Sequence, residues 1–232
     1  MGRRCSGPYA APVRTLLLDI GGVVLRSGHE MMARLGQRLP ELAPVTDRRG
    51  RLGPDPDPRW EAALSGTLSE RAYWAERAAD LGELTGDGPA VPRFMDRLYD
   101  SSGGGDDLVR PAARTLMEDV AGAGGTVAAL TNDLAAFHGD SDVARHPLFA
   151  LFDPLVDGSV TGVLKPDPRA YRLALDALGD PNPADVVFLD DMPANVAGAR
   201  RAGLTTIQVD LTDPDAAFDR ARTLLALAPS AA

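Results

Sequence analysis

The chain has 232 residues, of which 44% are hydrophobic and 25% charged, a composition typical of a globular protein with a sizeable core. Its formal charge of -9 and isoelectric point near 4.8 argue against nucleic acid or an anionic membrane as the main partner, because both require positive fields. A single cysteine, Cys5, excludes an internal disulfide and a zinc site built from cysteines. These features favour a cytoplasmic protein with a small-molecule partner.

The chain has no apolar run of the roughly 20 residues that a membrane span requires. The longest candidate, residues 16–25, is interrupted by Asp19. Residues 1–6 match a loose N-myristoylation pattern, but we interpret residues 1–12 as a disordered N-terminal tail.

The first predicted strand, residues 13–19, is an apolar run that ends in a carboxylate, Asp19. Gly21 and Gly22 follow, and glycines allow the backbone to turn tightly and to approach a ligand where a side chain would collide. Because parallel sheets bind ligands at the carboxyl ends of their strands, Asp19 is a candidate nucleophile.

Residues 26–110 are predicted to form an inserted helical cap, with a proline-rich connector at residues 54–58. The spacing of Thr67 and Glu70 predicts a capping box, after which an apolar helix face continues to Gly82. Residues 101–105 are interpreted as a flexible return. Such a hinge would let the cap open and close, although a tolerated surface loop has the same composition.

Strand-like runs return at residues 126–130, 185–189 and 205–209, and helices are predicted between them. Pro111 marks one helix start and Pro168 another, since proline suits the first helical turn. The alternation predicts an α/β fold with a doubly wound, mostly parallel, Rossmann-like sheet. Its core is assigned to residues 13–25 and 111–232, around the cap at residues 26–110.

Three further polar groups are placed at strand ends or helix starts. Thr131 and Asn132 follow the second strand, and their hydroxyl and amide suit phosphoryl oxygens. Lys165, before a helix, offers a point charge for phosphate. Asp190 and Asp191 end a hydrophobic strand, and adjacent carboxylates favour a hard cation such as Mg²⁺, although Asp191 also suits a plain capping role.

Together with Asp19, these groups resemble the motifs of the haloacid dehalogenase (HAD)-like hydrolase superfamily over residues 13–210. The run from Lys165 to Pro168 and the residues after Asp191, including Asn195, look most like the branch of sugar-phosphate phosphatases and epoxide-hydrolase phosphatase domains. In that branch a helical cap follows the first motif.

The resemblance implies a magnesium-dependent phosphatase acting on a small phosphorylated metabolite. Asp19 would attack phosphorus and form an aspartyl-phosphate, which water then cleaves. By similarity, the metal ligands would be Asp19, the backbone carbonyl of Gly21 and Asp191, with Asp190 a weaker candidate. The residues that would bind the phosphoryl group are Thr131, Asn132, Lys165, which also counts as catalytic, and Gly22.

Gly21 departs from the superfamily pattern, which usually has a second aspartate at this position. The backbone carbonyl that would bind the metal remains, but the carboxyl that protonates the leaving oxygen is lost. General acid catalysis of this kind typically raises the reaction rate by about 10²–10⁴-fold. We therefore expect a preference for good leaving groups, as in sugar 1-phosphates, acyl phosphates or aryl phosphates. His29 is a candidate substitute acid, and the alternative is a solvated surface histidine.

Two alternatives remain open. One is another chemistry of the superfamily, such as dehalogenation or phosphonate cleavage. The adjacent Asp190 and Asp191 count against the halide version, which needs no magnesium, and the absence of lysine from residues 26–110 counts against the phosphonate version. The other alternative is a catalytically weak or inactive phosphate-binding or regulatory protein, which Gly21 favours. The sequence is compatible with a monomer or a homodimer.

Overall fold

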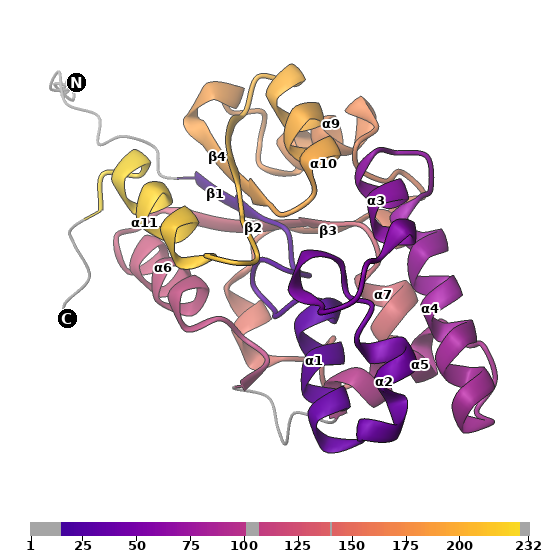
Figure 1. Ribbon diagram of the computed structural model, residues 1–232. Helices are drawn as coiled ribbons and strands as arrows, with labels where there is room; N and C mark the ends of the chain where they lie inside the picture. Colours follow the sequence, from indigo (N-terminus) through magenta and orange to yellow (C-terminus); the bar gives the residue numbers. More distant parts are fainter. Residues whose placement is uncertain (1–14, 101–106, 140, 228–232) are drawn as a thin grey trace, which may run out of the picture.

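A five-stranded sheet forms the centre of the computed structural model, which describes residues 15–100, 107–139 and 141–227 (Figure 1). Its strands, in the order β3-β2-β1-β4-β5, are all paired in parallel. Their bounds are β1 Thr15–Leu18, β2 Thr126–Thr131, β3 Leu155–Asp157, β4 Val186–Asp190 and β5 Thr205–Gln208. The predicted doubly wound parallel sheet is thus confirmed, with β1 at its centre.

Strand β3, at the edge of the sheet beside β2, was not predicted from the sequence. It has three residues and pairs only with β2, with Leu155 opposite Ala129. So short a segment shows no alternation of apolar and polar residues, and its strand conformation depends on the neighbouring strand.

Successive residues of each strand face opposite sides of the sheet, and both sides are covered by helices. On β1, Leu16 and Leu18 join one apolar cluster and Leu17 another. Helices α6 (Pro111–Gly122) and α11 (Asp215–Leu224) pack on the first side, and α9 (Pro168–Ala177) and α10 (Pro193–Arg201) on the second. Burial on both sides explains why the strands are apolar throughout.

The predicted helix starts at prolines are confirmed. Pro111 and Pro168 are the first residues of α6 and α9, and the Asp167 carboxylate accepts from the Arg169 backbone N–H at 2.9 Å. The shorter helices of this part are α7 Leu134–His138, η4 Pro147–Leu151, α8 Gly158–Thr161 and η5 Pro183–Asp185.

Residues 28–100 form a cluster of helices on one side of the molecule, coloured indigo to magenta in Figure 1. We call it the helical segment 28–100. Its elements are α1 Gly28–Arg38, η1 Pro40–Leu42, α2 Ala43–Thr46, η2 Gly50–Leu52, α3 Pro58–Leu64, α4 Glu70–Thr85 and α5 Val91–Asp100. None of the helices in the described residues has the length and apolar character needed to cross a membrane.

Helix α4 begins and ends later than the sequence predicted. Its N-cap is Ser69, whose hydroxyl accepts from the Ala72 N–H at 3.1 Å, and Glu70 is the first helical residue. The helix passes Gly82 and ends before Gly86, whose φ of 77° suits a glycine C-cap. The predicted box between Thr67 and Glu70 is therefore wrong, and the Glu70 side chain has no capping role.

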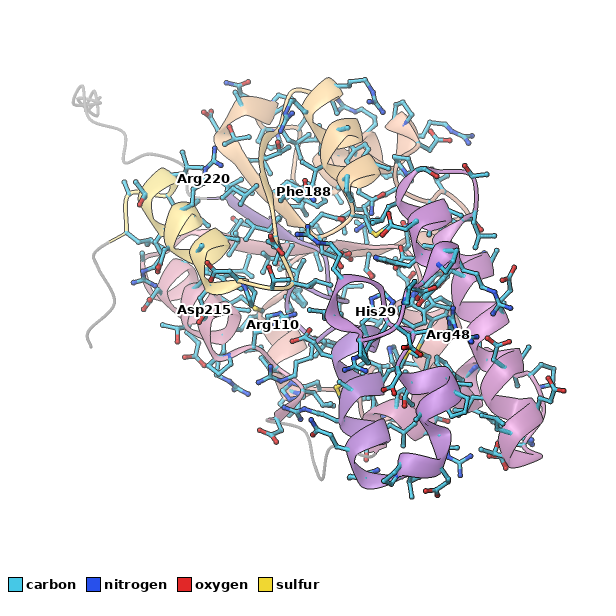
Figure 2. The ribbon with its side chains drawn as sticks, viewed as in Figure 1. His29, Arg48, Arg110, Phe188, Asp215 and Arg220 are labelled. Atoms are coloured by element: carbon cyan, nitrogen blue, oxygen red, sulfur yellow. The ribbon has the colours of Figure 1, made fainter. Side chains whose placement is uncertain are left out.

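Two connections join the helical segment 28–100 to the sheet, and they bond to each other. The Arg26 N–H donates to the Leu108 carbonyl at 2.8 Å, and the Arg110 N–H donates to Val24 at 2.9 Å. Arg110 lies at this junction in Figure 2, where its guanidinium donates to the Glu30 carboxylate. The predicted tail at residues 1–12 and the predicted return at residues 101–105 lie outside the described residues.

Candidate active site

Asp19 lies at the carboxyl edge of the sheet, directly after the central strand. Its backbone N–H donates to the Leu189 carbonyl at 2.9 Å, which continues the pairing of β1 with β4 by one residue. The side chain is mostly buried but opens into a pocket. The parallel topology thus holds this carboxylate where ligands of such sheets bind.

Lys165 lies between two carboxylates. Its Nζ is 3.0 Å from Asp19 Oδ1 and 2.7 Å from Asp190 Oδ2, and the ammonium is fully buried. Burial alone would lower the pKa of Lys165, but the charges of Asp19 and Asp190 raise it above its usual value. The lysine is therefore charged, and one of its three N–H groups remains for a ligand oxygen.

Asp190, the last residue of β4, is fully bonded to the protein. Besides Lys165, its carboxylate accepts from the Met192 N–H at 2.9 Å and from Asn195 Nδ2 at 3.1 and 3.2 Å. Burial raises the pKa of Asp190 to about 6, although the Lys165 charge opposes the shift. Asp190 is thus placed to anchor Lys165.

Asp191 faces the pocket, and Lys165 acts on it only through its charge, without an ion pair. Among the described residues, no lysine, arginine or histidine forms an ion pair with it. Burial, together with the charges of Asp190 and Glu70, raises the pKa of Asp191 well above its usual range. Oxygens of Asp19, Asp190 and Asp191 lie within 4.8 Å of one another. Asp190 is bonded to Lys165, Met192 and Asn195, so Asp19 and Asp191 are the two carboxylates of this group that fit a hard divalent cation such as Mg²⁺.

Gly22 makes room for Asp191. A Cβ on Gly22 would lie 2.4 Å from Asp191 Oδ2, and the φ of 76° is strained for any other residue. At Gly21, by contrast, a Cβ would meet no atom within 4 Å. The two glycines therefore have different structural requirements.

We expect Gly22→Ala to weaken the binding of a divalent cation such as Mg²⁺ by about tenfold or more, about 1.4 kcal/mol, since the added Cβ displaces the Asp191 carboxylate. Titration of the ion by calorimetry measures the effect. Gly21→Ala changes the same turn without the collision and should lose less affinity for the ion. Equal affinities in the two variants would contradict this account of the turn.

Thr131 and Asn132 lie where β2 ends, and both line the pocket. The Asn132 amide bonds to the backbone of Lys165, donating to its carbonyl at 3.1 Å and accepting from its N–H at 2.8 Å. Asn132 thus fixes the loop that presents Lys165. Its second amide N–H and the Thr131 hydroxyl are the groups left for phosphoryl oxygens, and that contact stays a prediction.

The helical segment 28–100 supplies the opposite wall of the pocket. The residues that it contributes include His29, Trp60, Glu70, Trp74, Met95 and Tyr99, and Ser27, the N-cap of α1, lies beside them. Trp60 and Trp74 are each buried, and each lines the pocket. Glu70 was not predicted from the sequence as a site residue, because the predicted capping box gave it a structural role.

His29 is buried at the end of α1 nearest to the sheet (Figure 2), so the solvated alternative is wrong. Its Nε2 lies 2.8 Å from the Tyr73 hydroxyl, which donates to Asp57 at 2.7 Å. Burial lowers the pKa of His29 to about 3. The imidazole is therefore neutral near pH 7.

A sequence model of the haloacid dehalogenase-like hydrolases matches residues 13–203, and the chain belongs to that family. It is 34% identical over 219 residues to mouse acyl-CoA dehydrogenase family member 10. The aligned region covers 91% of this chain and 19% of that protein. It is 35% identical over 115 residues to the phosphatase MT3486 of Mycobacterium tuberculosis. This aligned region covers 45% of this chain and 52% of the phosphatase.

A dehalogenase is also among the relatives. The (S)-2-haloacid dehalogenase 4A of Burkholderia cepacia is 28% identical, over 57% of this chain and 60% of that protein. The fold matches the crystal structure of the HAD-hydrolase candidate YfnB of Bacillus subtilis, bound to magnesium, with a TM-score of 0.61, 17% identity, and 86% and 87% of the two chains covered. The family is thus established, and it includes both phosphatases and dehalogenases.

Proposed function

We propose that the chain is a magnesium-dependent phosphatase, which hydrolyses a small phosphorylated metabolite through an aspartyl-phosphate on Asp19. The observation that carries the proposal is Asp191, a half-buried carboxylate without an ion-pair partner among the described residues, facing the nucleophile across a turn that only glycine allows. A phosphatase needs a divalent cation at this place, whereas a dehalogenase does not.

The pocket lining also favours a phosphatase over a 2-haloacid dehalogenase. A 2-haloacid carries a carboxylate, and carboxylates are bound best by arginine or lysine. The described residues that line the pocket include neither. Lys165 lies below the pocket and is held by Asp19 and Asp190, close to where the phosphoryl group would sit.

Asp19, the Gly21 carbonyl and Asp191 would hold the ion in this proposal. When bound, Mg²⁺ supplies a positive charge that stabilises the phosphoryl oxygens. Asp19 attacks phosphorus, and Lys165, Thr131 and the turn at Gly22 bind the transferring group. Positioning and charge neutralisation supply most of the rate in phosphoryl transfer, which suits these residues.

The helical segment 28–100 acts as the cap of the site in this proposal. Its residues form the wall opposite the sheet, so the substrate is enclosed between the two. Closure of such a wall excludes water while Asp19 attacks. The aromatic rings of Trp60 and Trp74 would then contact the leaving group and select it.

The test is phosphate release from a panel of sugar, acyl and aryl phosphates, with and without magnesium. We expect turnover that requires the ion and is lost on chelation. Chloride release from 2-chloropropionate, measured in parallel, tests the dehalogenase chemistry. Halide release without phosphate release would contradict the proposal, and silence in both assays would favour a phosphate-binding protein.

A further inference from the structure

Loss of the second aspartate at Gly21 leaves the proposed phosphatase without its usual proton donor, and the pocket contains a carboxyl that nothing so far has used. Glu70 is the first residue of α4 and lines the pocket together with Asp19 and Asp191. Because Ser69 caps the helix, the Glu70 carboxyl is not needed for the helix end. It is held instead by Trp74, whose Nε1 lies 3.4 Å from Glu70 Oε1.

The position of Glu70 matches the side from which the leaving group departs. Attack and departure lie roughly in line in phosphoryl transfer, so the leaving oxygen points away from Asp19 and from the sheet. The helical segment 28–100 forms the wall on that side, and Glu70 belongs to it. A carboxyl there is placed to meet the leaving oxygen.

The other titratable groups that line the pocket are less suited to give a proton. Burial raises the pKa of Asp133 as well, but its carboxylate is bound by Arg71, whose Nε lies 3.0 Å from Asp133 Oδ1. Burial lowers the pKa of His29 to about 3 and that of His138 to about 4, so both rings are neutral near pH 7. The Tyr99 hydroxyl donates to the Arg26 carbonyl at 3.0 Å.

Glu70 itself retains its proton to a higher pH than an ordinary carboxyl. Burial, supported by the charges of Asp19 and Asp190, raises the pKa of Glu70 to about 7. The Trp74 hydrogen bond and the Lys165 charge act in the opposite direction, but the net shift is upward. A group that titrates near neutral pH can give a proton in one step and take one in the next.

We propose that Glu70 is the general acid and base of the reaction, in place of the carboxyl that Gly21 lacks; this inference rests on the proposed phosphatase function. In the first step Asp19 forms a bond to phosphorus, the bond to the leaving oxygen breaks, and that oxygen takes the Glu70 proton. In the second step the Glu70 carboxylate takes a proton from water as the water attacks phosphorus. The bond to Asp19 breaks, inorganic phosphate leaves, and Glu70 is protonated again.

The experiment compares glycerol 2-phosphate, which has a poor leaving group, with p-nitrophenyl phosphate, which has a good one. Glu70→Gln retains the side-chain volume and an oxygen that can accept from Trp74, but it holds no transferable proton. We expect it to lower kcat/KM for glycerol 2-phosphate by about 10²-fold and to affect p-nitrophenyl phosphate much less. Glu76→Gln, an exposed change on the same helix, is the matched control.

Gly21→Asp provides a rescue, because the structure has open space for a side chain there. In the Glu70→Gln background, Gly21→Asp should restore most of the lost activity on glycerol 2-phosphate. The role of Glu70 would be overturned if Glu70→Gln lost equal activity on both substrates or lost none on either. It would also be overturned if the wild-type enzyme hydrolysed p-nitrophenyl phosphate but not glycerol 2-phosphate. A wild type that hydrolyses neither probe, with or without magnesium, would overturn the phosphatase function and this role with it.

Discussion

Asp19→Asn is expected to lower phosphate release by about 10⁴-fold or more, the scale of loss found when a covalent nucleophile is removed. An amide does not attack phosphorus, and none of the described groups beside Lys165 replaces the lost carboxylate, because Asp190 is bonded to Lys165, Met192 and Asn195. Steady-state release of phosphate from the best substrate of the panel, at saturating magnesium, measures the effect.

The control for this variant is Asp215→Asn, the same change at an exposed residue that starts α11 and lies outside the pocket lining. It should retain wild-type turnover. Thermal unfolding of both variants checks that the fold is intact, since Asp19→Asn removes a charge beside the buried Lys165. Residual activity of Asp19→Asn within tenfold of the wild type would contradict the nucleophile assignment.

The sheet was predictable because its strands are apolar on both faces and end in polar residues. In a parallel sheet all carboxyl ends lie at one edge, so Asp19, Thr131 and Asp190 had to meet once the strands were recognised. Edge strand β3 was not predictable in this way. It lacks its own periodic pattern and depends on pairing with β2.

The separate environments of the two adjacent aspartates required the structure. A sequence gives two carboxylates at a strand end, but not which one meets a lysine from a distant loop. Lys165 bonds to Asp190, and Gly22 leaves room for Asp191. The predicted ranking of Asp191 above Asp190 as a metal ligand agrees with this placement and stays a prediction.

Glu70 was overlooked for a local reason. Serine and threonine are both good N-caps, and the sequence offers Thr67 and Ser69 within three residues. A start at Thr67 uses Glu70 in a capping box, whereas the observed start at Ser69 places Glu70 in the pocket. With the observed start, Tyr73 and Trp74 pack against Trp60 of α3, a tertiary contact that a local capping pattern does not contain.

The second large effect is expected on stability, at a buried ion pair inside the helical segment 28–100. The Asp57 carboxylate accepts from Arg77 Nη2 at 2.9 Å and from the Tyr73 hydroxyl at 2.7 Å, and it also caps α3 by accepting from the Trp60 N–H at 3.2 Å. Asp57→Ala leaves the Arg77 guanidinium buried without its main partner. We expect a loss of about 3–5 kcal/mol in the free energy of unfolding.

Asp80→Ala is the matched control, because Asp80 also pairs with Arg77, at 3.3 Å, but is partly exposed. Its removal should lower the free energy of unfolding by about 0–1 kcal/mol. Urea unfolding of the two variants separates the cases, and equal losses would contradict a dominant role for Asp57.

The same carboxylate predicts the pH dependence of stability. Burial would raise the pKa of Asp57, but the bonds from Tyr73 and Arg77 outweigh it and hold the pKa below its usual value. A lowered pKa in the folded state means that the stabilisation is present above the unfolded pKa of about 3.9 and is lost as the pH falls from there through the folded pKa. In Asp57→Asn this part of the acid sensitivity should disappear.

Loss of the Asp57 carboxylate should also affect the pocket. Because Trp60 and Tyr73 pack against His29 beside the pocket, Asp57→Asn should raise KM, while the site residues of the sheet remain in position.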